Sequence, residues 1–313
     1  MTGYRHLDAS EIAALLPGAA LSGPMCAIES LGLVDARATE RVLTYAQSEQ
    51  FLAAALRNDR VVGVVTTERL YLQRRAEFGQ RCAVLVDDPH QAFWGLHLRL
   101  FRDSSFYQAP RAGRSPEIGD SRVAPSAVVH DGVRIGDRCR IADHVVVHAG
   151  TVIGDDVVIQ AGTIVGSEGF EYKTLGGVRT LVPHDAGVRI GDRVEIGANC
   201  AIDRGLLAQD TTIGEDTKMD NLVHVSHACR IGKRCLIAAL VAVGGSVCLD
   251  DGVWLGPNSA ISNRVTVGRG GNVSLGAVVV SDVEPDQKVS GNFAVEHGAF
   301  LKLFMEQLRA AKR

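Results

Sequence analysis

The sequence has no long apolar segment and no excess of charge of either sign. None of its apolar runs approaches the roughly 20 residues that a membrane-spanning helix needs, and no charged-then-apolar leader opens the chain. The 33 Lys and Arg residues nearly balance the 36 Asp and Glu residues, which gives a formal net charge of −3 without a basic block. We therefore expect a soluble protein with no transmembrane segment and with no nucleic acid as a partner.

Cysteine pairs with the spacing of redox or zinc motifs are also absent. None of the seven cysteines forms a Cys-x-x-Cys pair. Four of them fall within the repeat described below, where small residues pack: Cys139, Cys200, Cys235 and Cys248. This usage fits a reducing compartment, so we expect a cytoplasmic protein.

What the sequence does contain is an aliphatic residue at every sixth position over much of its length. The series runs from Val123 to Val165, resumes from Ile190 to Ile202, and continues from Ile213 to Val279. Its members are Val, Ile or Leu except for Met219. This period fits neither a helix, at about 3.6, nor an amphipathic strand, at about 2. It fits a coil of three short parallel strands with one inward residue each, and therefore predicts a parallel β-helix. In such a rod, function falls to residues that point outward.

Residues 1–105 lack this period and are predicted to form a separate α/β domain. Strands are expected at 41–45, 61–67 and 82–86, and helices at 48–57 and 89–101. A linker containing Pro and Gly is expected at 106–122.

The β-helix is expected to cover residues 123–285, with a start near Ile118 or Val123. Residues 166–187 interrupt the repeat and are too many for a turn, so they are predicted to form a protruding loop. The longer spacing between Ile202 and Ile213 predicts a small turn deformation at 203–205.

The remaining residues, 286–313, form a C-terminal extension. An amphipathic helix is expected over 294–313, with Phe300, Leu301, Phe304 and Leu308 on one side. This helix is predicted either to cap the open end of the β-helix or to dock on a neighbouring molecule.

Several segments outside the repeat carry more specific information: GSEGFEY at 166–172, IGDRVEIGAN at 190–199, AIDRG at 201–205, the Asp220-Asn221 pair and His227. In this order they resemble the UDP-3-O-acylglucosamine N-acyltransferases of lipid A biosynthesis. Residues 42–46 and 82–86 resemble the uridine-binding domain of that family, so the resemblance covers nearly the full chain. It implies a left-handed β-helix acyltransferase domain, a uridine-nucleotide-binding domain at 1–105, and a homotrimer.

The resemblance implies an enzyme that moves a 3-hydroxyacyl group from acyl carrier protein to the 2-amine of UDP-3-O-acyl-glucosamine. The acyl group arrives on the 4′-phosphopantetheine of the carrier as a co-substrate, so no other cofactor and no metal is expected. His227 matches the catalytic histidine of the family. A neutral imidazole, with an ordinary pKa of about 6.5, suits removal of a proton from the attacking amine.

Three further residues match the catalytic cleft of the family. Asp220 and Asn221 are expected to orient His227 or hold the donor, although the same pair also suits an ordinary turn. Gly245 matches a glycine whose N–H stabilises the tetrahedral oxyanion, a contact worth about 3 kcal/mol. A glycine at that place also eases a tight corner.

Two aromatic residues of the first domain match the pair that stacks on uracil in the family. These are Tyr45 and Phe51, and stacking of this kind is worth about 1–3 kcal/mol. Phe51 equally suits the apolar face of its helix and hence the core.

The chain departs from the family in three places. Ser262-Asn263-Arg264 stands where the family has a histidine in an Asn-Gly-His context, so Arg264 is predicted to contact a phosphate, an acidic carrier protein or a different acceptor. Glu171 stands where glycine is typical, and the C-terminal region has one helix in place of a longer helical tail. We interpret the chain as a divergent member of this family. The resemblance predicts its chemistry more firmly than its substrate.

Other functions stay open at this point. One is N-acylation of another nucleotide-linked amino sugar with a shorter donor, acyl-CoA or acyl carrier protein. A second is a non-catalytic scaffold. A third is a zinc-dependent hydratase of the β-helix type, with these candidate ligands: His144, His148, His224 and His227.

A basic surface for acyl carrier protein is a further hypothesis, beside the more common interpretation of a solvated charged face. Its members are Arg264, Arg269, Lys302 and Arg309.

Overall fold

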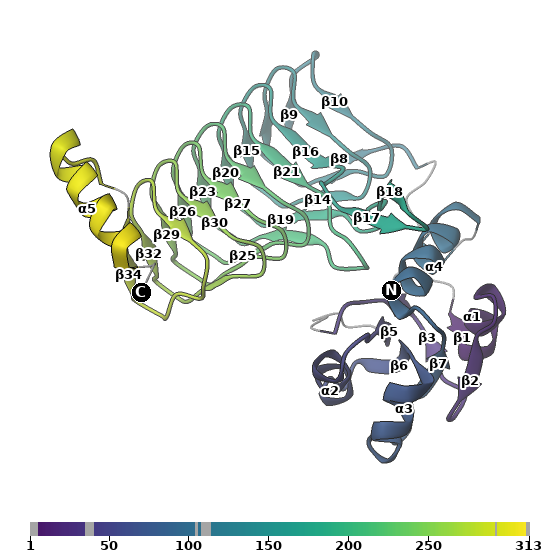
Figure 1. Ribbon diagram of the computed structural model, residues 1–313. Coiled ribbons are helices and arrows are strands. Elements are labelled where there is room, and N and C mark those ends of the chain that lie inside the picture. Colours follow the sequence, from purple (N-terminus) through teal and green to yellow (C-terminus); the bar gives the residue numbers. More distant parts are fainter. Residues whose placement is uncertain (1–5, 35–40, 104–105, 108–113, 292, 311–313) are drawn as a thin grey trace.

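The computed structural model describes residues 6–34, 41–103, 106–107, 114–291 and 293–310, and it has three parts (Figure 1). An α/β domain packs beside a long β-helix, and a single helix, α5 (His297–Ala310), stands off the far end. The predicted fold class is confirmed: the chain is a left-handed parallel β-helix with an N-terminal α/β region and a C-terminal helix.

Three parallel sheets form the faces of the rod. The first contains β10 (Val128–Val129), β13 (Val146–Val147), β16 (Ile164–Ser167), β21 (Ala201–Asp203), β24 (His224–Val225), β27 (Ala242–Val243), β30 (Ala260–Ile261) and β33 (Val278–Val279). The second contains β8 (Glu117–Ile118), β11 (Arg134–Ile135), β14 (Thr151–Ile153), β19 (Val188–Ile190), β22 (Thr211–Ile213), β25 (Arg230–Ile231), β28 (Cys248–Leu249) and β31 (Thr266–Val267). The third contains β9 (Arg122–Val123), β12 (Arg140–Ile141), β15 (Val158–Ile159), β20 (Glu195–Ile196), β23 (Lys218–Met219), β26 (Leu236–Ile237), β29 (Trp254–Leu255), β32 (Asn272–Val273) and β34 (Lys288–Val289).

The inward residues of the hexad form one continuous aliphatic core along the rod. Val129 pairs with Val147 on the next coil, and Val147 pairs with Val165, so inward residues stack directly above one another. Side chains such as Val147 and Val225 are fully buried, and each burial of this kind stabilises the fold by about 1.5–3 kcal/mol. The first strand is β8 and the last is β34, so the coils extend slightly beyond the expected bounds of 123 and 285 at both ends.

Corners between the sheets are turned by residues with a left-handed backbone. One column of corners has Ala228, Ser246 and Arg264 on successive coils, with φ of 55°, 59° and 65°. Such a conformation costs a non-glycine residue about 1–2 kcal/mol. The backbone of the neighbouring coil offsets this cost, because Ser246 N donates to His227 O and Arg264 N donates to Gly245 O.

The N-terminal domain has a five-stranded sheet in the order β2-β7-β6-β5-β4. Its strands are β2 (Ala20–Ser22), β4 (Ser30–Leu31), β5 (Val42–Tyr45), β6 (Val61–Thr66) and β7 (Cys82–Leu85), and a separate pair joins β1 (Leu7–Asp8) to β3 (Ala27–Ile28). Its helices are α1 (Ala9–Leu15), α2 (Glu49–Arg57), α3 (Glu68–Arg74) with the short turn Arg75–Glu77, and α4 (Pro89–Asp103). The three predicted strands and two predicted helices are therefore present, whereas α1, α3 and the shorter strands were not predicted.

Helix starts and one disulfide stand out in this domain. Helices α2 and α3 begin after Ser48 and Thr67, whose hydroxyl oxygens accept N–H groups of the first turn. Cys26 and Cys82 form a disulfide in the core.

The segment predicted as a protruding loop is a β-hairpin that joins the two domains. Strands β17 (Tyr172–Leu175) and β18 (Val178–Leu181) pair across Gly176-Gly177, both of which have positive φ as a two-residue hairpin turn requires. The hairpin packs on α4, since Gly176 N donates to Gln91 Oε1 at 3.0 Å. Figure 1 shows it between the rod and α4.

The residues after the hairpin complete this junction. Val182 is fully buried in the core of the N-terminal domain, together with Leu206 and Leu207 from the rod. Asp185 fixes the loop that carries these two leucines, because its carboxylate accepts from Leu207 N and Ala208 N. The turn deformation expected at 203–205 is thus a loop that docks on the N-terminal domain, and it is centred slightly later in the sequence.

Candidate functional site

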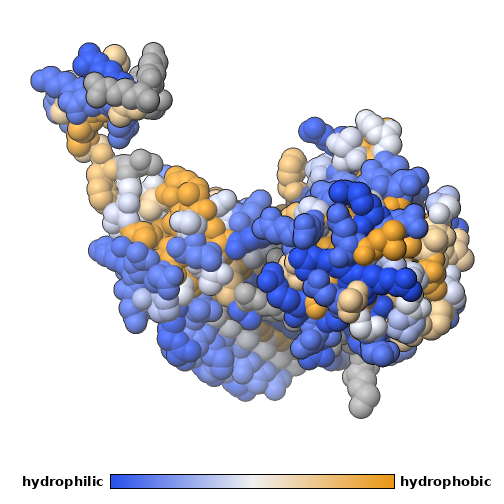
Figure 2. All heavy atoms as spheres, turned by 60° about the horizontal axis from the view of Figure 1, so that its bottom comes forward, coloured by the Kyte–Doolittle hydropathy of each residue, from blue (hydrophilic) through white to orange (hydrophobic). Residues whose placement is uncertain are grey.

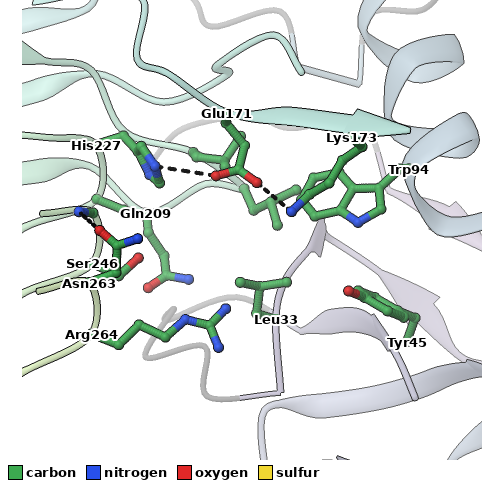
Figure 3. A pocket seen from close by; sticks show the side chains of 14 residues that line it. Leu33, Tyr45, Trp94, Glu171, Lys173, Gln209, His227, Ser246, Asn263 and Arg264 are labelled. Carbon is green, nitrogen blue, oxygen red and sulfur yellow. Dashed lines mark hydrogen bonds and ion pairs between the residues drawn. The ribbon is translucent and has the colours of Figure 1, made fainter. Parts of the chain in front are cut away.

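A pocket of about 310 Å³ opens where the N-terminal domain, the hairpin and the rod meet (Figure 3). Figure 3 shows that the rod, the hairpin and the N-terminal domain each contribute side chains from a different side. The lining is Leu33, Tyr45, Trp94, Glu171, Lys173, Leu206, Leu207, Gln209, His227, Ala228, Gly245, Ser246, Asn263 and Arg264. The pocket therefore depends on the docking of the two domains.

Three successive coils of the rod supply one wall. His227, Gly245 and Asn263 occupy equivalent corner positions, and the left-handed residue that follows each of them also lines the pocket. Because the strand spacing is about 4.8 Å, these corners form a regular column. The repeat therefore brings together residues that are far apart in the sequence.

His227 is largely buried at this wall, with 14% of its side chain exposed. Its Nε2 lies 3.5 Å from Glu171 Oε2 of the hairpin. Among the described residues, no group hydrogen-bonds its buried Nδ1. A Cβ on Gly245 would lie 2.7 Å from Nε2, so only glycine leaves room for the ring in this orientation.

Glu171 links His227 to the N-terminal domain. Its Oε1 is paired with Lys173 Nζ, and Lys173 Nζ lies 4.8 Å from the centre of the Trp94 ring, within the range of a cation–π contact. Burial alone would raise the pKa of Glu171, but the contact with His227 and then the pairing with Lys173 hold this pKa at about 2. The carboxylate is therefore ionised at neutral pH.

A second layer of polar groups lies behind His227. The His184 ring is fully buried and meets the His227 ring edge to face, with centroids 5.1 Å apart. His184 Nδ1 lies 3.4 Å from Glu168 Oε1, and burial raises the pKa of Asp203, whose Oδ1 accepts from Ser167. This layer holds the imidazole in place from the side away from the pocket.

The role of the Gly245 N–H as an oxyanion donor stays a prediction. This N–H already donates to Asn263 Oδ1 at 2.9 Å. The reason is the corner ladder, in which an Asn or Asp on one coil accepts an N–H of the preceding coil, as Asn221 does from Ala198. In this structure Gly245 serves the site through the space it leaves for His227.

Asp220 and Asn221 are not brought to His227 within one chain. Asn221 Oδ1 accepts from Ala198 N, and Asp220 Oδ1 accepts from Asn221 N. Both are exposed at a corner one sheet before that of His227, and neither lines the described pocket. Their expected role therefore needs a neighbouring molecule.

The predicted uracil-stacking pair is only partly at the pocket. Tyr45 lines it, and its ring packs 4.8 Å from Phe93 with Trp94 beside it. Phe51 is 43% exposed on the first turn of α2 and is not among the described lining residues. The alternative that Phe51 belongs to the core is therefore wrong, and its stacking on uracil stays a prediction.

Arg264 lines the pocket, as the prediction of a substrate contact requires. The other members of the hypothetical basic surface lie elsewhere: Arg269 on the rod, and Lys302 and Arg309 on α5. Sequence reasoning missed Lys173 and Trp94, which had no motif to mark them. Glu171 was recognised only as a departure from a family pattern.

The histidines of the zinc hypothesis do not converge. His148 stacks on His130 with centroids 4.9 Å apart, and His224 Nε2 hydrogen-bonds Ser226. Within the described part of the chain, no cluster of His, Cys, Asp or Glu has the arrangement of a metal site. Over the same residues, no helix combines the length and the apolar character needed to span a bilayer.

Two family models of hexapeptide-repeat transferases match parts of this chain. Residues 132–167 match the bacterial transferase hexapeptide model (six repeats), and 177–205 match the hexapeptide repeat of succinyl-transferase. The UDP-3-O-acylglucosamine N-acyltransferase of Caulobacter sp. (strain K31) is 38% identical over 153 residues, which is 48% of this chain and 41% of that protein. These enzymes are homologues of this chain.

The homologues extend across several bacterial genera. The UDP-3-O-acylglucosamine N-acyltransferase of Bordetella pertussis (strain Tohama I) is 32% identical over 207 residues, covering 62% of this chain and 52% of that protein. The enzyme of the same name from Janthinobacterium sp. (strain Marseille) is 31% identical, covering 58% and 48%. The chain thus spans about half the length of the UDP-3-O-acylglucosamine N-acyltransferases it matches.

Solved structures of related name also match. The Arabidopsis UDP-N-acetylglucosamine acyltransferase has 22% identity and a TM-score of 0.46, covering 56% of this chain and 68% of that one. The enzyme of the same name from Francisella novicida has 23% identity and a TM-score of 0.40, with coverage of 56% and 63%.

Proposed function

We propose that the protein is an N-acyltransferase of lipid A biosynthesis. It transfers a 3-hydroxyacyl group from acyl carrier protein to the 2-amine of UDP-3-O-acyl-glucosamine, with His227 as general base. The supporting observation is that His227 presents Nε2 to a pocket shared by two domains, in a chain whose homologues bear this enzyme name. The residues before 106 form the uridine-nucleotide-binding domain in this proposal, and the coils form the acyltransferase domain.

The chemistry follows from the position of the imidazole. The amine nitrogen attacks the thioester carbonyl carbon, and His227 Nε2 takes a proton from that nitrogen as the C–N bond forms. The C–S bond then breaks, and the phosphopantetheine thiol leaves with one proton.

The pocket also suits a nucleotide sugar. Tyr45 provides an aromatic face at one end, and Lys173 and Arg264 provide positive charge for a diphosphate. Figure 3 shows Arg264 and Tyr45 on the same side of the pocket, away from Glu171. Stacking by Phe51 stays a prediction, since it lies outside the described lining.

Further parts of the proposal concern partners. A homotrimer would bring the exposed Asp220-Asn221 corner of one molecule towards His227 of another, which one chain alone does not achieve. Acyl carrier protein is the donor and co-substrate. We also propose the cytoplasm as the compartment, where this carrier and nucleotide sugars occur together.

The test is acyl transfer by His227→Ala. A general base contributes about 100- to 10,000-fold, so the variant should lose activity by that factor while its far-UV circular dichroism stays unchanged. Product is measured by mass spectrometry with a 3-hydroxyacyl carrier protein and the UDP-sugar. His130→Ala, a stacked histidine of the rod outside the pocket lining, is the matched control. Wild-type rates for His227→Ala would refute the assignment.

A second candidate is transfer to another nucleotide-linked amino sugar with a shorter acyl-CoA or carrier-protein donor. Glu171 and Arg264 favour it, because both line the pocket and both replace residues typical of the family. Parallel assays with acetyl-CoA and with a long 3-hydroxyacyl carrier protein separate the two candidates. The preferred donor is the one with the higher kcat/KM.

A further inference from the structure

Glu171 lines the pocket and contacts the candidate base directly. It lies just before β17, and the hairpin holds it over the corner column of the rod (Figure 3). Its two oxygens have different partners: Oε1 is paired with Lys173, whereas Oε2 faces His227 Nε2 at 3.5 Å. One oxygen is therefore engaged within the hairpin, and the other is directed at the reacting end of the imidazole.

The 3.5 Å separation is longer than a normal hydrogen bond, which spans about 2.7–3.2 Å. When His227 acts as a base, Nε2 carries a lone pair, and two acceptors then face each other. This arrangement is unfavourable unless a donor lies between them. A nitrogen about 2.9 Å from each atom closes a triangle with the 3.5 Å side, so one ligand nitrogen can donate to both.

The charge of the site favours a cationic donor. Burial alone would raise the pKa of Glu171, but its pairing with Lys173 still favours the ionised carboxylate when His227 is neutral. Only 20% of its side chain is exposed, so water screens this charge less than it would at the surface. Lys173 neutralises the carboxylate from the Oε1 side and leaves the Oε2 side for a ligand.

We propose that Glu171 binds the acceptor amine as an ammonium ion beside His227 Nε2 and thereby selects an amino sugar over the corresponding hydroxy sugar. This inference rests on the proposed function, because it assigns the acceptor chemistry of the same site. A hydroxyl donates one neutral hydrogen bond, whereas an ammonium donates charge-assisted bonds to both acceptors. Glycine at this position would provide neither contact.

Protons and electrons balance in the transfer that follows. The ammonium first releases one proton to water, which leaves a neutral amine next to Glu171. His227 Nε2 then takes a second proton from the amine nitrogen as this nitrogen forms the bond to the acyl carbon. As the C–S bond breaks, the thiolate takes that proton from His227, so the products are an amide, a thiol and one released proton.

A purely structural role for Glu171 predicts something different. In that case the carboxylate serves only to hold Lys173 against Trp94, and removal of either partner has the same effect. For ammonium binding the two substitutions have opposite effects. Loss of Glu171 removes the binding group, whereas loss of Lys173 removes a competing cation.

The experiment measures binding by titration calorimetry at pH 7 with UDP-glucosamine and UDP-glucose, which differ in the amine. We expect the wild-type protein to bind UDP-glucosamine at least tenfold more tightly. Glu171→Gln should abolish this ratio and leave UDP-glucose affinity unchanged, whereas Lys173→Met should maintain or increase the ratio. Glu195→Gln, which alters an exposed carboxylate on the rod, is the matched control and should behave as wild type.

Two results would overturn the inference alone: equal wild-type affinity for both sugars, or a Glu171→Gln variant that keeps the wild-type ratio. A parallel loss of both affinities in Glu171→Gln and Lys173→Met would assign Glu171 a structural role and overturn it too. Absence of binding of either UDP-sugar, and of UDP itself, would refute the proposed function and this inference together. Because no acyl donor is present, a failure of catalysis does not affect the readout.

Discussion

At the scale of single residues, the site depends on two glycines, because their lack of a side chain leaves room for neighbouring rings. Gly245 leaves the space in which the His227 ring lies, and Gly169 covers His184, His227 and Asp203 so closely that a Cβ would lie 2.7 Å from His184 Nε2. The sequence could mark His227 and Gly245 only through the resemblance to a family, because a strict repeat has a corner of this kind on every coil. It could not show that Asn263 accepts the Gly245 N–H, because that bond depends on the stacking of consecutive coils.

Gly245→Ala tests this steric role. The new Cβ would lie 2.7 Å from His227 Nε2 and 2.8 Å from Cε1, so the ring must move away from the pocket. We expect at least a tenfold loss of kcat in the acyl-transfer assay, with a destabilisation of about 1–3 kcal/mol from overpacking.

Gly95→Ala is the control for this substitution. Gly95 lies in α4 with nothing within 4 Å of an added Cβ, so alanine should stabilise the helix by about 1 kcal/mol and leave kcat unchanged. Full activity in Gly245→Ala would mean that the ring tolerates the methyl group and that Gly245 has no steric role.

At the scale of elements, the hairpin β17–β18 forms part of the site, and Glu171, a departure from the family pattern, lies at its start. It brings Glu171 to His227 and Lys173 to Trp94, and Val182, which directly follows it, lies in the core of the other domain. The sequence predicted an interruption here from the loss of the hexad. It did not predict docking, because burial of Val182 requires a partner surface from residues almost a hundred positions away.

Val182→Asp should undock the two domains. The carboxylate would be buried without a partner, which costs several kcal/mol, so the N-terminal domain should separate from the rod. We expect a larger radius of gyration by small-angle X-ray scattering and loss of UDP binding, while the circular dichroism of the rod remains.

The matched variant is Val178→Asp, on the same hairpin but 65% exposed, and it should leave both measurements unchanged. An unchanged radius of gyration and normal UDP binding in Val182→Asp would show that the junction does not depend on this contact.

At the scale of the whole molecule, the apolar side of α5 is not covered by the rest of the described chain. Its described apolar side chains, Phe300, Leu301, Phe304 and Met305 among them, are roughly half exposed, so the helix does not cap the rod within the chain. Figure 2 shows apolar surface gathered on the rod near the base of this helix. The sequence predicted the helix and its apolar side, but a repeat pattern carries no information on what covers that side. Residues 311–313 and the side chain of Leu308 lie outside the described residues.

The proposed trimer gives a direct measurement. Light scattering coupled to size exclusion should give a mass about three times 33.4 kDa for the wild-type chain. Phe300 and Phe304 stack on each other with centroids 5.9 Å apart, and we expect the double substitution Phe300→Glu and Phe304→Glu to weaken association at micromolar concentration.

Lys302→Glu on the same helix is the control, because it changes charge without removing apolar area. A monomeric wild-type chain would rule out the trimer. A double variant with the full wild-type mass would place association entirely on the rod.

The left-handed corners next to His227 recur at a regular spacing along the pocket wall. Ala228, Ser246 and Arg264 occupy three consecutive corners about 4.8 Å apart, and the coil backbone fixes each corner whatever side chain it carries. Exchanging Ser246 and Arg264 would therefore shift the positive charge by one coil while the rod keeps its shape. Under the proposed function, a ligand whose phosphate lies one coil nearer to His227 would then be preferred.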